Sequence, residues 1–241
     1  MDDLKALVAA AGRGTRAGLP HPKTLFPIQG KPILVRIAEL VAPLDAAPTV
    51  VVSPEGEAPI RDCLATHHIA SHIVVQPEPL GMGDAVLRFS GSPAYDHAED
   101  VLLIWGDIPF LQRDTLAAVV EAHRTQGNDF TFATRVVDSA YTRVSRDETG
   151  RVQRVVETRE VGGGNAPGER DVGLFVFRKE LVLEMLREEL DGKWGAATGE
   201  QGFLYIIGHL SARGCKVAAL PVATELDLVS LNSMSDVHAY L

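Results

Sequence analysis

Apolar and polar positions follow two different spacings along the chain. Short apolar runs rich in β-branched residues predict strands, and longer stretches with apolar residues at near-helical spacing predict helices. In the first part of the chain the two kinds alternate, which predicts an α/β fold: a Rossmann-like, open, mostly parallel sheet with helices on both faces. The predicted strands are Ala6–Ala10, Thr49–Val52, His72–Val75, Val101–Trp105 and Phe130–Ala133. The predicted helices are Ile33–Val41, Ala58–Ala65, Asp84–Phe89 and Thr115–His123.

The pattern changes after residue 135. Two extended segments flank a glycine-rich stretch, helical spacing then returns twice, and a strand and a short helix close the chain. We find no repeat, low-complexity tract or long linker, so we expect one domain over residues 1–241, with a first part (1–135) and a second part (136–241) that adds a β subregion. The later predicted elements are Val152–Glu157, Val172–Phe177, Leu181–Leu190, Phe203–Ala212, Val217–Leu220 and a helix from Ser233.

Composition narrows the class of protein. The chain has 241 residues, 46% of them hydrophobic and 23% charged, and a net charge of −9 with scattered Lys and Arg, which argues against a nucleic-acid partner. Its two cysteines, Cys63 and Cys215, form neither a disulfide framework nor a zinc ligand set. Neither a membrane span of about 20 apolar residues nor a signal-peptide pattern is present, so we expect a cytoplasmic protein.

The loop after the first strand is rich in glycine and carries basic residues. Gly12 and Gly14 follow Ala9–Ala11, and Arg16 and Lys23 come next. Glycines directly after a buried strand let backbone N–H groups approach a phosphate, and cations on the same loop suit a triphosphate. The alternative is that Arg16 and Lys23 are solvated surface charges. Because parallel sheets bind ligands at the carboxyl ends of their strands, we expect the chemistry in the loops after the first, third and fourth strands.

Two other phosphate-binding motifs, the dinucleotide fingerprint and the P-loop, are excluded by the residues around the glycines. Gly12, Gly14 and Ala17 satisfy the dinucleotide fingerprint, but prolines interrupt the interval where its helix belongs and the second strand comes too late. A P-loop is excluded because Gly30-Lys31 is followed by Pro32.

The remaining pattern is specific. Gly12-x-Gly14-Thr15-Arg16 and then Pro22-Lys23-x-Leu25-x-Pro27-Ile28-x-Gly30-Lys31-Pro32 resemble the signature of the sugar-1-phosphate nucleotidyltransferases, most closely the N-terminal pyrophosphorylase domain of the N-acetylglucosamine-1-phosphate uridyltransferases. The resemblance covers essentially the whole chain and weakens after residue 135. It implies the nucleotidyltransferase fold, with residues 1–135 binding the nucleotide and residues 136–241 binding the acceptor.

Two positions of the third loop resemble the family's base-reading pair. Gln76 follows the third strand, and Gly81 lies five residues further on. A Gln amide offers a donor and an acceptor, which matches the imide edge of uracil or thymine. Met82 and Asp84 stand where uridylyl-transferring members commonly have Thr and His, and an Asp there also occurs in adenylyl-transferring relatives. Uridine is the base we expect.

The fourth strand delivers Asp107 to its carboxyl end, within Trp105-Gly106-Asp107-Ile108-Pro109. The match to the family's aromatic-Gly-Asp-x-Pro implies an Mg²⁺ ligand, whereas Asp107 as a helix or turn cap is the alternative. Asn232 resembles the family's second metal ligand, and an Asn before a helix is also a common cap. The resemblance implies catalytic roles for Arg16, Lys23 and Asp107, and nucleotide contacts for Ala9, Ala10, Ala11, Gly12, Gly14, Gln76, Gly81, Met82, Trp105 and Gly106.

The acceptor region departs most from the family. Thr142 replaces a Gly, Asp171 replaces the Asn of the amino-sugar enzymes, and Leu204 and Tyr205 stand where a Thr and an Asp are expected. Glu157 keeps the family's acid and could accept hydrogen bonds from sugar hydroxyls. We expect Thr142, Glu157 and Asp171 to bind the acceptor, whose identity these changes leave open.

We therefore expect an Mg²⁺-dependent transferase of nucleotide-sugar biosynthesis that joins an NTP, UTP being favoured, to a sugar 1-phosphate and releases pyrophosphate. Nucleic acid and membrane are not expected as partners, and a homo-oligomer is among the assembly states left open. The alternatives are a cytidylyl- or adenylyl-transferase with another phosphate or phosphonate acceptor, a catalytically idle nucleotide-binding paralogue and, disfavoured by the prolines, an NAD-linked oxidoreductase.

Overall fold

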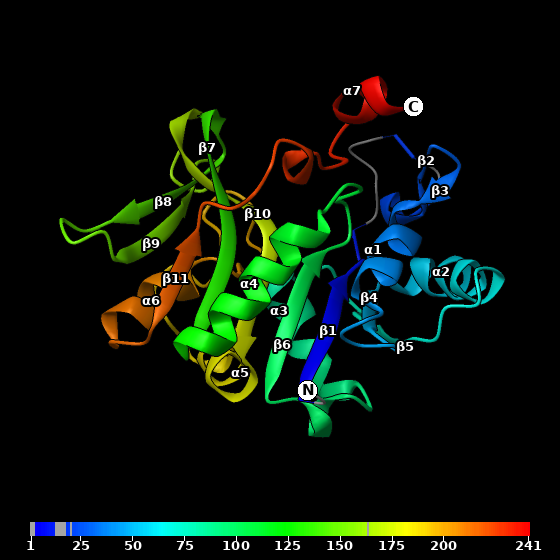
Figure 1. Ribbon diagram of the computed structural model, residues 1–241, viewed down its shortest axis with the longest axis horizontal. Coiled ribbons are helices and arrows are strands. Elements are labelled where there is room, and N and C mark those ends of the chain that lie inside the picture. Colours follow the sequence, from blue (N-terminus) through cyan, green and yellow to red (C-terminus); the bar gives the residue numbers. More distant parts are fainter. Residues whose placement is uncertain (1–2, 13–17, 20, 163) are drawn as a thin grey trace.

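A seven-stranded sheet forms the centre of the computed structural model, which describes residues 3–12, 18, 19, 21–162 and 164–241 (Figure 1). The strand order is β11-β7-β10-β6-β1-β4-β5. β10 runs antiparallel to both of its neighbours, and the other strands run parallel to one another. The strands are β1 (Leu4–Ala9), β4 (Thr49–Val52), β5 (His72–Val75), β6 (Asp100–Trp105), β7 (Phe130–Ala140), β10 (Ala166–Arg178) and β11 (Val217–Leu220).

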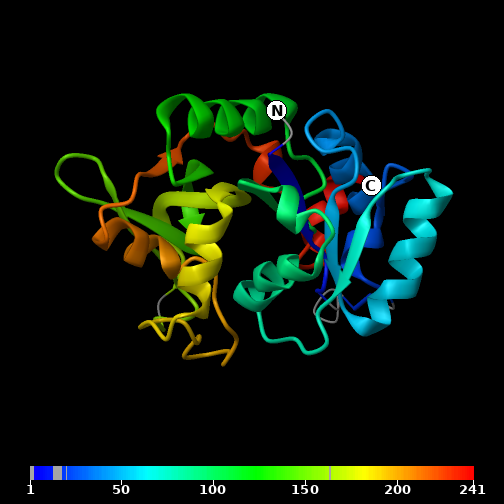
Figure 2. The same ribbon diagram turned by 90° about the horizontal axis from the view of Figure 1, so that it is seen from below.

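Helices cover both faces of the sheet, as Figure 2 shows for α4 on one side and α5 on the other. Successive strand residues point to opposite faces, so Val8 and Ile104 join the core under α1, α2 and α4, while Leu7 and Leu103 join the core under α3, α5 and α6. The helices are α1 (Ile33–Val41), α2 (Pro54–Thr66), α3 (Met82–Leu87), α4 (Arg113–Gln126), α5 (Lys179–Arg187), α6 (Ile206–Ala212) and α7 (Met234–Val237).

Local sequence sets several helix boundaries. Ser53 caps α2 by accepting a hydrogen bond from the Gly56 N–H at 3.1 Å, and Pro54 takes the first helical position, where no N–H is needed. α4 ends at Gly127, whose φ of 60° is the left-handed conformation typical of helix ends.

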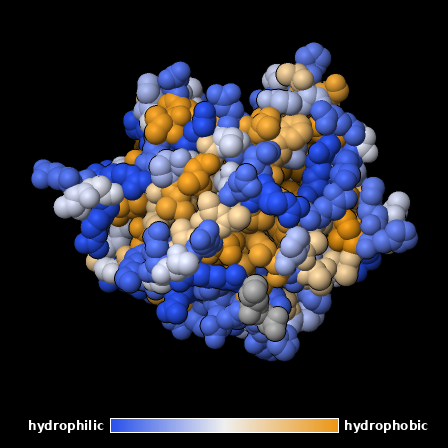
Figure 3. All heavy atoms as spheres, in the orientation of Figure 1, coloured by the Kyte–Doolittle hydropathy of each residue, from blue (hydrophilic) through white to orange (hydrophobic). Residues whose placement is uncertain are grey.

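Two small ribbons stand outside the sheet. The strands β2 (Pro27–Ile28) and β3 (Lys31–Pro32) form a tight hairpin, and β8 (Thr142–Arg146) pairs with β9 (Val152–Glu157). Val152 and Val155 of β9 pack in the same core cluster as residues of α6. The tip of the β8–β9 ribbon is hydrophilic in Figure 3, whereas apolar residues show over the centre of the same face.

The structure confirms the predicted fold class and extends several elements. β7 is longer than the predicted Phe130–Ala133, and β10 is longer than the predicted Val172–Phe177 and enters the main sheet between β6 and β7. β8 was not predicted, and the helix expected over Phe203–Ala212 begins at Ile206. The added lengths of β7 and β10 pair with each other, as Gly168 does with Val137. Within the described ranges, no helix combines the length and the apolar character that crossing a bilayer requires.

Candidate active site

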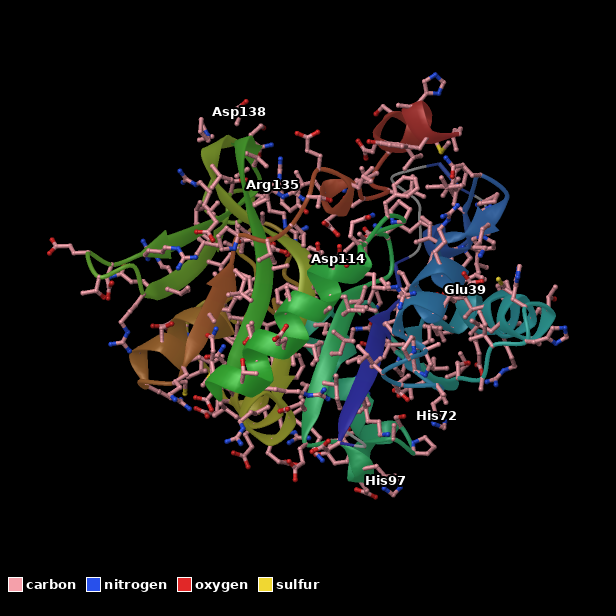
Figure 4. The ribbon with its side chains drawn as sticks, viewed as in Figure 1. Glu39, His72, His97, Asp114, Arg135 and Asp138 are labelled. Carbon is pink, nitrogen blue, oxygen red and sulfur yellow. The ribbon has the colours of Figure 1, made fainter. Side chains whose placement is uncertain are left out.

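The candidate residues lie at the carboxyl edge of the sheet. In Figure 4, His72, the first residue of β5, lies toward the amino edge, and Arg135 lies near the opposite edge, where β7 ends. β1, β5 and β6 all end at the carboxyl edge, because they run parallel. The C-terminal helix α7 also lies at this edge (Figure 1).

Lys23, Gly12 and Asp107 come together there. Lys23 begins a 3₁₀ turn (Lys23–Leu25), and its Nζ donates a hydrogen bond to Oδ2 of Asp107. A Cβ added to Gly12 would lie 3.3 Å from Lys23 Cε, so the glycine loop and the lysine stem are in contact. The structure thus joins the first predicted loop to the acid predicted after β6.

Gly106 is needed for this arrangement. Its N–H donates to the Ala9 carbonyl at 2.9 Å, and an added Cβ would lie 2.6 Å from that oxygen. Only glycine lets the end of β6 lie so close to the end of β1. Ala9 and Trp105 are register partners on the two strands, so Ala9–Gly12 and Trp105–Asp107 form one surface.

Asp107 meets the requirements of a metal ligand. Its Oδ1 is buried and has no hydrogen-bond partner among the described residues, which is costly unless a ligand satisfies it. Across the described part of the chain no three His, Cys, Asp or Glu side chains form a metal-binding group. A magnesium site does not need three, since Mg²⁺ commonly takes one or two protein oxygens with phosphate oxygens and water.

The C-terminal segment brings Asn232 to the same place. The Leu231 N–H donates to the backbone carbonyl of Asp107 at 2.9 Å, so Asn232 follows directly on a residue bonded to Asp107. The Asn232 side chain is exposed and its Nδ2 donates to Ser230 Oγ at 2.8 Å, while its backbone N–H donates to Asp236. The Leu231 bond thus sets Asn232 one residue away from a direct backbone contact with Asp107.

Asp227 anchors this segment, and sequence reasoning gave it no role. It is buried and accepts hydrogen bonds from the Gln112 N–H at 2.7 Å and from Thr115 Oγ1 at 2.9 Å, both at the start of α4. It also accepts from the backbone and the hydroxyl of Thr224 at 2.7 and 2.8 Å. The signal available in the sequence was an acid five positions before Asn232, which does not show what the acid contacts.

Gln76 is buried at the end of β5 and its amide is already bound within the protein. Its Nε2 donates to the Gly81 carbonyl at 3.0 Å and to Oδ2 of Asp84 at 2.9 Å. Asp84 in turn pairs with Arg88, whose NH2 and Nε lie 2.7 and 3.1 Å from its two oxygens. Both amide hydrogens of Gln76 are thus used, and Oε1 is the part left to meet a ligand.

Gly81 and Met82 form the start of α3. Gly81 has a φ of 108°, and a Cβ there would collide with the backbone of Gln201. Gln201 donates its N–H to the Leu80 carbonyl at 2.6 Å and accepts from the Gly83 N–H at 3.0 Å. The candidate base loop is therefore tied to the segment that precedes α6.

The predicted acceptor residues gather at the β8–β9 ribbon and β10. Thr142 and Glu157 are register partners, and the Thr142 hydroxyl donates to Oδ1 of Asp171 at 2.5 Å. Asp171 is fully buried and also accepts from the Gly173 N–H at 3.1 Å. Burial raises the pKa of the Asp171 carboxyl and, against the opposing effect of Arg159, the pKa of the Glu157 carboxyl. Leu204 lies in the core and contributes no polar group.

Tyr141 lies close enough to Asp171, Glu157 and Asp107 for all three carboxylates to affect its pKa. Burial is the largest cause of its raised pKa, and the carboxylates of Asp171, Asp107 and Glu157 raise it further. Arg170 opposes them, with its guanidinium 4.1 Å from the Tyr141 ring centre and its NH2 2.8 Å from the phenol oxygen. No sequence signal indicated Arg170. Two predicted site residues, Gly14 and Arg16, lie outside the described residues.

A known protein family and several curated proteins match most of this chain. The family described as the MobA-like NTP transferase domain matches residues 6–192. Bifunctional protein GlmU of Leifsonia xyli subsp. xyli (strain CTCB07) is 33% identical over 224 residues, covering 92% of this chain and 46% of that protein. GlmU of Pseudomonas paraeruginosa (strain DSM 24068 / PA7) is 31% identical over 239 residues, covering 97% of this chain and 49% of that protein. The chain thus spans about half the length of the curated relatives it matches.

Solved structures share the fold at low sequence identity. A protein described as a glucose-1-phosphate thymidylyltransferase from Bacillus anthracis superposes with a TM-score of 0.73 at 13% identity, covering 98% of this chain and 93% of its own. HddC from Yersinia pseudotuberculosis superposes with a TM-score of 0.67 at 17% identity, and the match covers 100% of this chain and 98% of HddC. The predicted family and the predicted nucleotidyltransferase class of enzyme are confirmed: the chain belongs to the MobA-like NTP transferase family.

Proposed function

We propose that the protein transfers a nucleoside monophosphate from an Mg·NTP, with UTP favoured, to a sugar 1-phosphate and releases pyrophosphate. The observation that carries the proposal is that Lys23 contacts both Gly12 and Asp107, and that the second carboxylate oxygen of Asp107 is buried without a partner among the described residues. A triphosphate needs several cations and N–H groups at one place; Lys23 lies at this edge of the sheet, and we propose that Arg16 and the backbone N–H groups of residues 12–14 supply the rest.

In the proposed reaction an oxygen of the acceptor phosphate attacks the α-phosphorus. A new P–O bond forms as the bond to the β-phosphate oxygen breaks, and pyrophosphate leaves with the bonding electron pair. The chain's contribution is to align the two phosphates and to meet their negative charge. Lys23 would bind the phosphoryl oxygens, and Arg16 with the backbone N–H groups of residues 12–14 would hold the pyrophosphate.

Asp107 and Asn232 would hold the divalent ion, for which we propose Mg²⁺. When bound, the ion neutralises phosphate charge next to the attacked phosphorus. Lys23 supplies a positive charge beside Asp107. Its flexible stem lets the ammonium group move from the carboxylate to a phosphate when the substrate arrives.

The proposed substrates follow from the relatives and from the side chains present. The curated relatives quoted above are GlmU proteins, and Gln76 Oε1 can accept the N3–H of uracil. Glu157 is the half-buried acid that could accept hydrogen bonds from the acceptor's hydroxyl groups. Thr142 and Asp171 are bonded to each other, which supports an acceptor that differs from that of the amino-sugar enzymes.

The proposal is tested by pyrophosphate release from the four Mg·NTPs, each combined with a panel of sugar 1-phosphates. We expect turnover with UTP that EDTA abolishes. Lys23→Ala, Arg16→Ala and Asp107→Asn should each reduce kcat by about 100-fold or more, because each removes charge that meets the reacting phosphates. Lys216→Ala is the control, since this exposed lysine lies at the start of β11, at the opposite edge.

Other outcomes would contradict the proposal in distinct ways. Turnover with CTP or ATP and a non-sugar phosphate would replace it with a related transferase. Binding of Mg·NTP without turnover on any acceptor, and no NTP formation from pyrophosphate and a nucleotide-sugar, would indicate an idle paralogue. Normal activity of the Asp107→Asn protein would exclude the assigned site.

A further inference from the structure

Gln76 is held in one orientation by two acceptors. Its two Nε2 hydrogens point to the Gly81 carbonyl and to Oδ2 of Asp84, at 3.0 and 2.9 Å. Turning the amide by a half-rotation would place Oε1 against both of these oxygens, with no proton between them. Buried acceptors that face each other are costly, so the observed orientation is strongly preferred.

Asp84 is itself held in place. Its side chain is 9% exposed, and Arg88, one helical turn further along, binds both of its carboxylate oxygens. A carboxylate only accepts hydrogen bonds, so Asp84, paired with Arg88, receives a hydrogen from Gln76 and cannot donate one. The chain Arg88–Asp84–Gln76 therefore leaves one amide atom of Gln76 outside these hydrogen bonds, the Oε1 oxygen.

A fixed carbonyl oxygen distinguishes two pyrimidines. Uracil has a donor at N3 and an acceptor at position 4, whereas cytosine has an acceptor at N3 and an amino donor at position 4. Whichever of these positions faces Gln76, only one of the two bases offers it a hydrogen. A freely rotating amide would accept either base, since it can present its donor or its acceptor.

We infer that Asp84 is a positioning residue that locks the Gln76 amide and thereby selects between uracil-type and cytosine-type nucleotides. The inference rests on the proposed nucleotide site, and it adds to that proposal the residue that sets base choice. Asp84 touches neither the base nor the phosphates in this assignment, and it acts through the orientation of Gln76.

The test measures binding, so it needs no acceptor. Mg·UTP and Mg·CTP are titrated by calorimetry into the wild type and into Asp84→Asn and Asp84→Ala. Asn can offer its NH₂ group toward Gln76 and Ala removes the contact, so each variant takes away one of the two acceptors that fix the amide and leaves only the Gly81 carbonyl. We expect the wild type to prefer one nucleotide, with UTP favoured, and the ratio of the two Kd values to fall about 10-fold or more in both variants.

A matched control separates this role from a general weakening of the fold. Glu57 and Arg61 form the same one-turn ion pair on α2, at 2.8 Å, and Glu57→Gln should leave the Kd ratio unchanged. Asp84→Asn keeps the side-chain volume, and a thermal melt of each variant checks that it is folded. If Asp84 were only structural, both nucleotides would weaken together and the ratio would stay constant, which would overturn the inference.

The result also distinguishes the two proposals. If the wild type binds neither Mg·NTP, the proposed function fails and the inference fails with it. If the wild type discriminates and folded Asp84 variants discriminate equally well, the inference fails alone and the proposed function stands. A wild type that binds both nucleotides equally would likewise exclude an orienting role for Asp84.

Discussion

Asp171 is a charged residue in a fully buried position. Its two carboxylate oxygens each receive one hydrogen bond, from Thr142 at 2.5 Å and from the Gly173 N–H at 3.1 Å. Burial nevertheless raises the pKa of this carboxyl above its ordinary value of 3.8. The two departures from the family, Thr for Gly and Asp for Asn, thus meet in one hydrogen bond.

The raised pKa predicts a pH-dependent effect of Asp171→Asn. The folded protein binds the Asp171 proton more tightly than the unfolded chain, so this group's contribution to stability is present below about pH 4 and lost as the pH rises through the raised pKa. Asn carries no charge, can accept from Gly173 and can donate to Thr142. We expect Asn to raise the free energy of unfolding by about 1–2 kcal/mol near pH 8 and by less near pH 4.

Urea unfolding of the two proteins at both pH values measures this difference. Asp138→Asn is the control, because Asp138 is exposed near the end of β7 (Figure 4). A stability gain that is the same at both pH values would show that the charge of Asp171 is not its cause.

At the residue scale, the sequence identified the site residues that belong to a recognisable motif. It missed the residues whose role depends on contacts made only in the folded chain. Gly12, Lys23 and Asp107 were predicted from the family's signature, and the structure brings them together. Asp227 and Arg170 were not assigned, because their roles depend on contacts with Thr115 and Tyr141, over 100 and 29 positions away. Nothing in a local pattern reports such partners.

At the scale of elements, the pairing of β10 is irregular at Gly173, where the strand packs beside the Trp105–Ile108 segment. The register with β7 shifts between Asp171 and Phe175, and Gly173 has a φ of 77°. A Cβ on Gly173 would lie 2.7 Å from Ile108 Cδ1 and 2.8 Å from Trp105 Cε3. The bulge thus packs on the two residues that flank Gly106 and Asp107.

Gly173→Ala should therefore destabilise the protein for two reasons. The positive φ costs about 1–2 kcal/mol for any L-residue with a side chain, and the crowded methyl group adds about 1–3 kcal/mol. Gly150→Ala is a matched control, since Gly150 has a φ of 83° and no atom within 4 Å of an added Cβ. Denaturant unfolding gives both values, and an equal loss at the two positions would contradict the packing argument.

The bounds of helices and strands with a clear local hydrophobic pattern were predicted more closely than the bounds of strands that depend on pairing with another strand. The predicted Ile33–Val41, Thr49–Val52 and His72–Val75 match α1, β4 and β5. The outer halves of β7 and β10 mix polar with apolar residues and are extended because they pair with each other, as in Arg135 with Arg170. That pairing joins positions 35 residues apart, which a sliding window does not detect.

At the scale of the whole molecule, the expected first and second parts share one sheet. β10 belongs to residues 136–241, yet its two neighbours, β6 and β7, begin in residues 1–135. Phe175 pairs with Leu103 on one side and with Phe132 on the other, and its ring contacts those of Trp105, Phe130 and Phe203. Removing either part would therefore open the central core.

This topology predicts a single unfolding transition. The chain's two tryptophans report on the two parts: Trp105 ends β6, and Trp194 lies in the segment between α5 and α6. In Trp105→Phe the fluorescence follows the second part, and in Trp194→Phe it follows the first. Because β10 cannot leave the sheet without separating β6 from β7, we expect the urea midpoint from fluorescence to equal that from far-ultraviolet circular dichroism within each variant. Two separate midpoints in one variant would show that the two parts unfold independently despite the shared sheet.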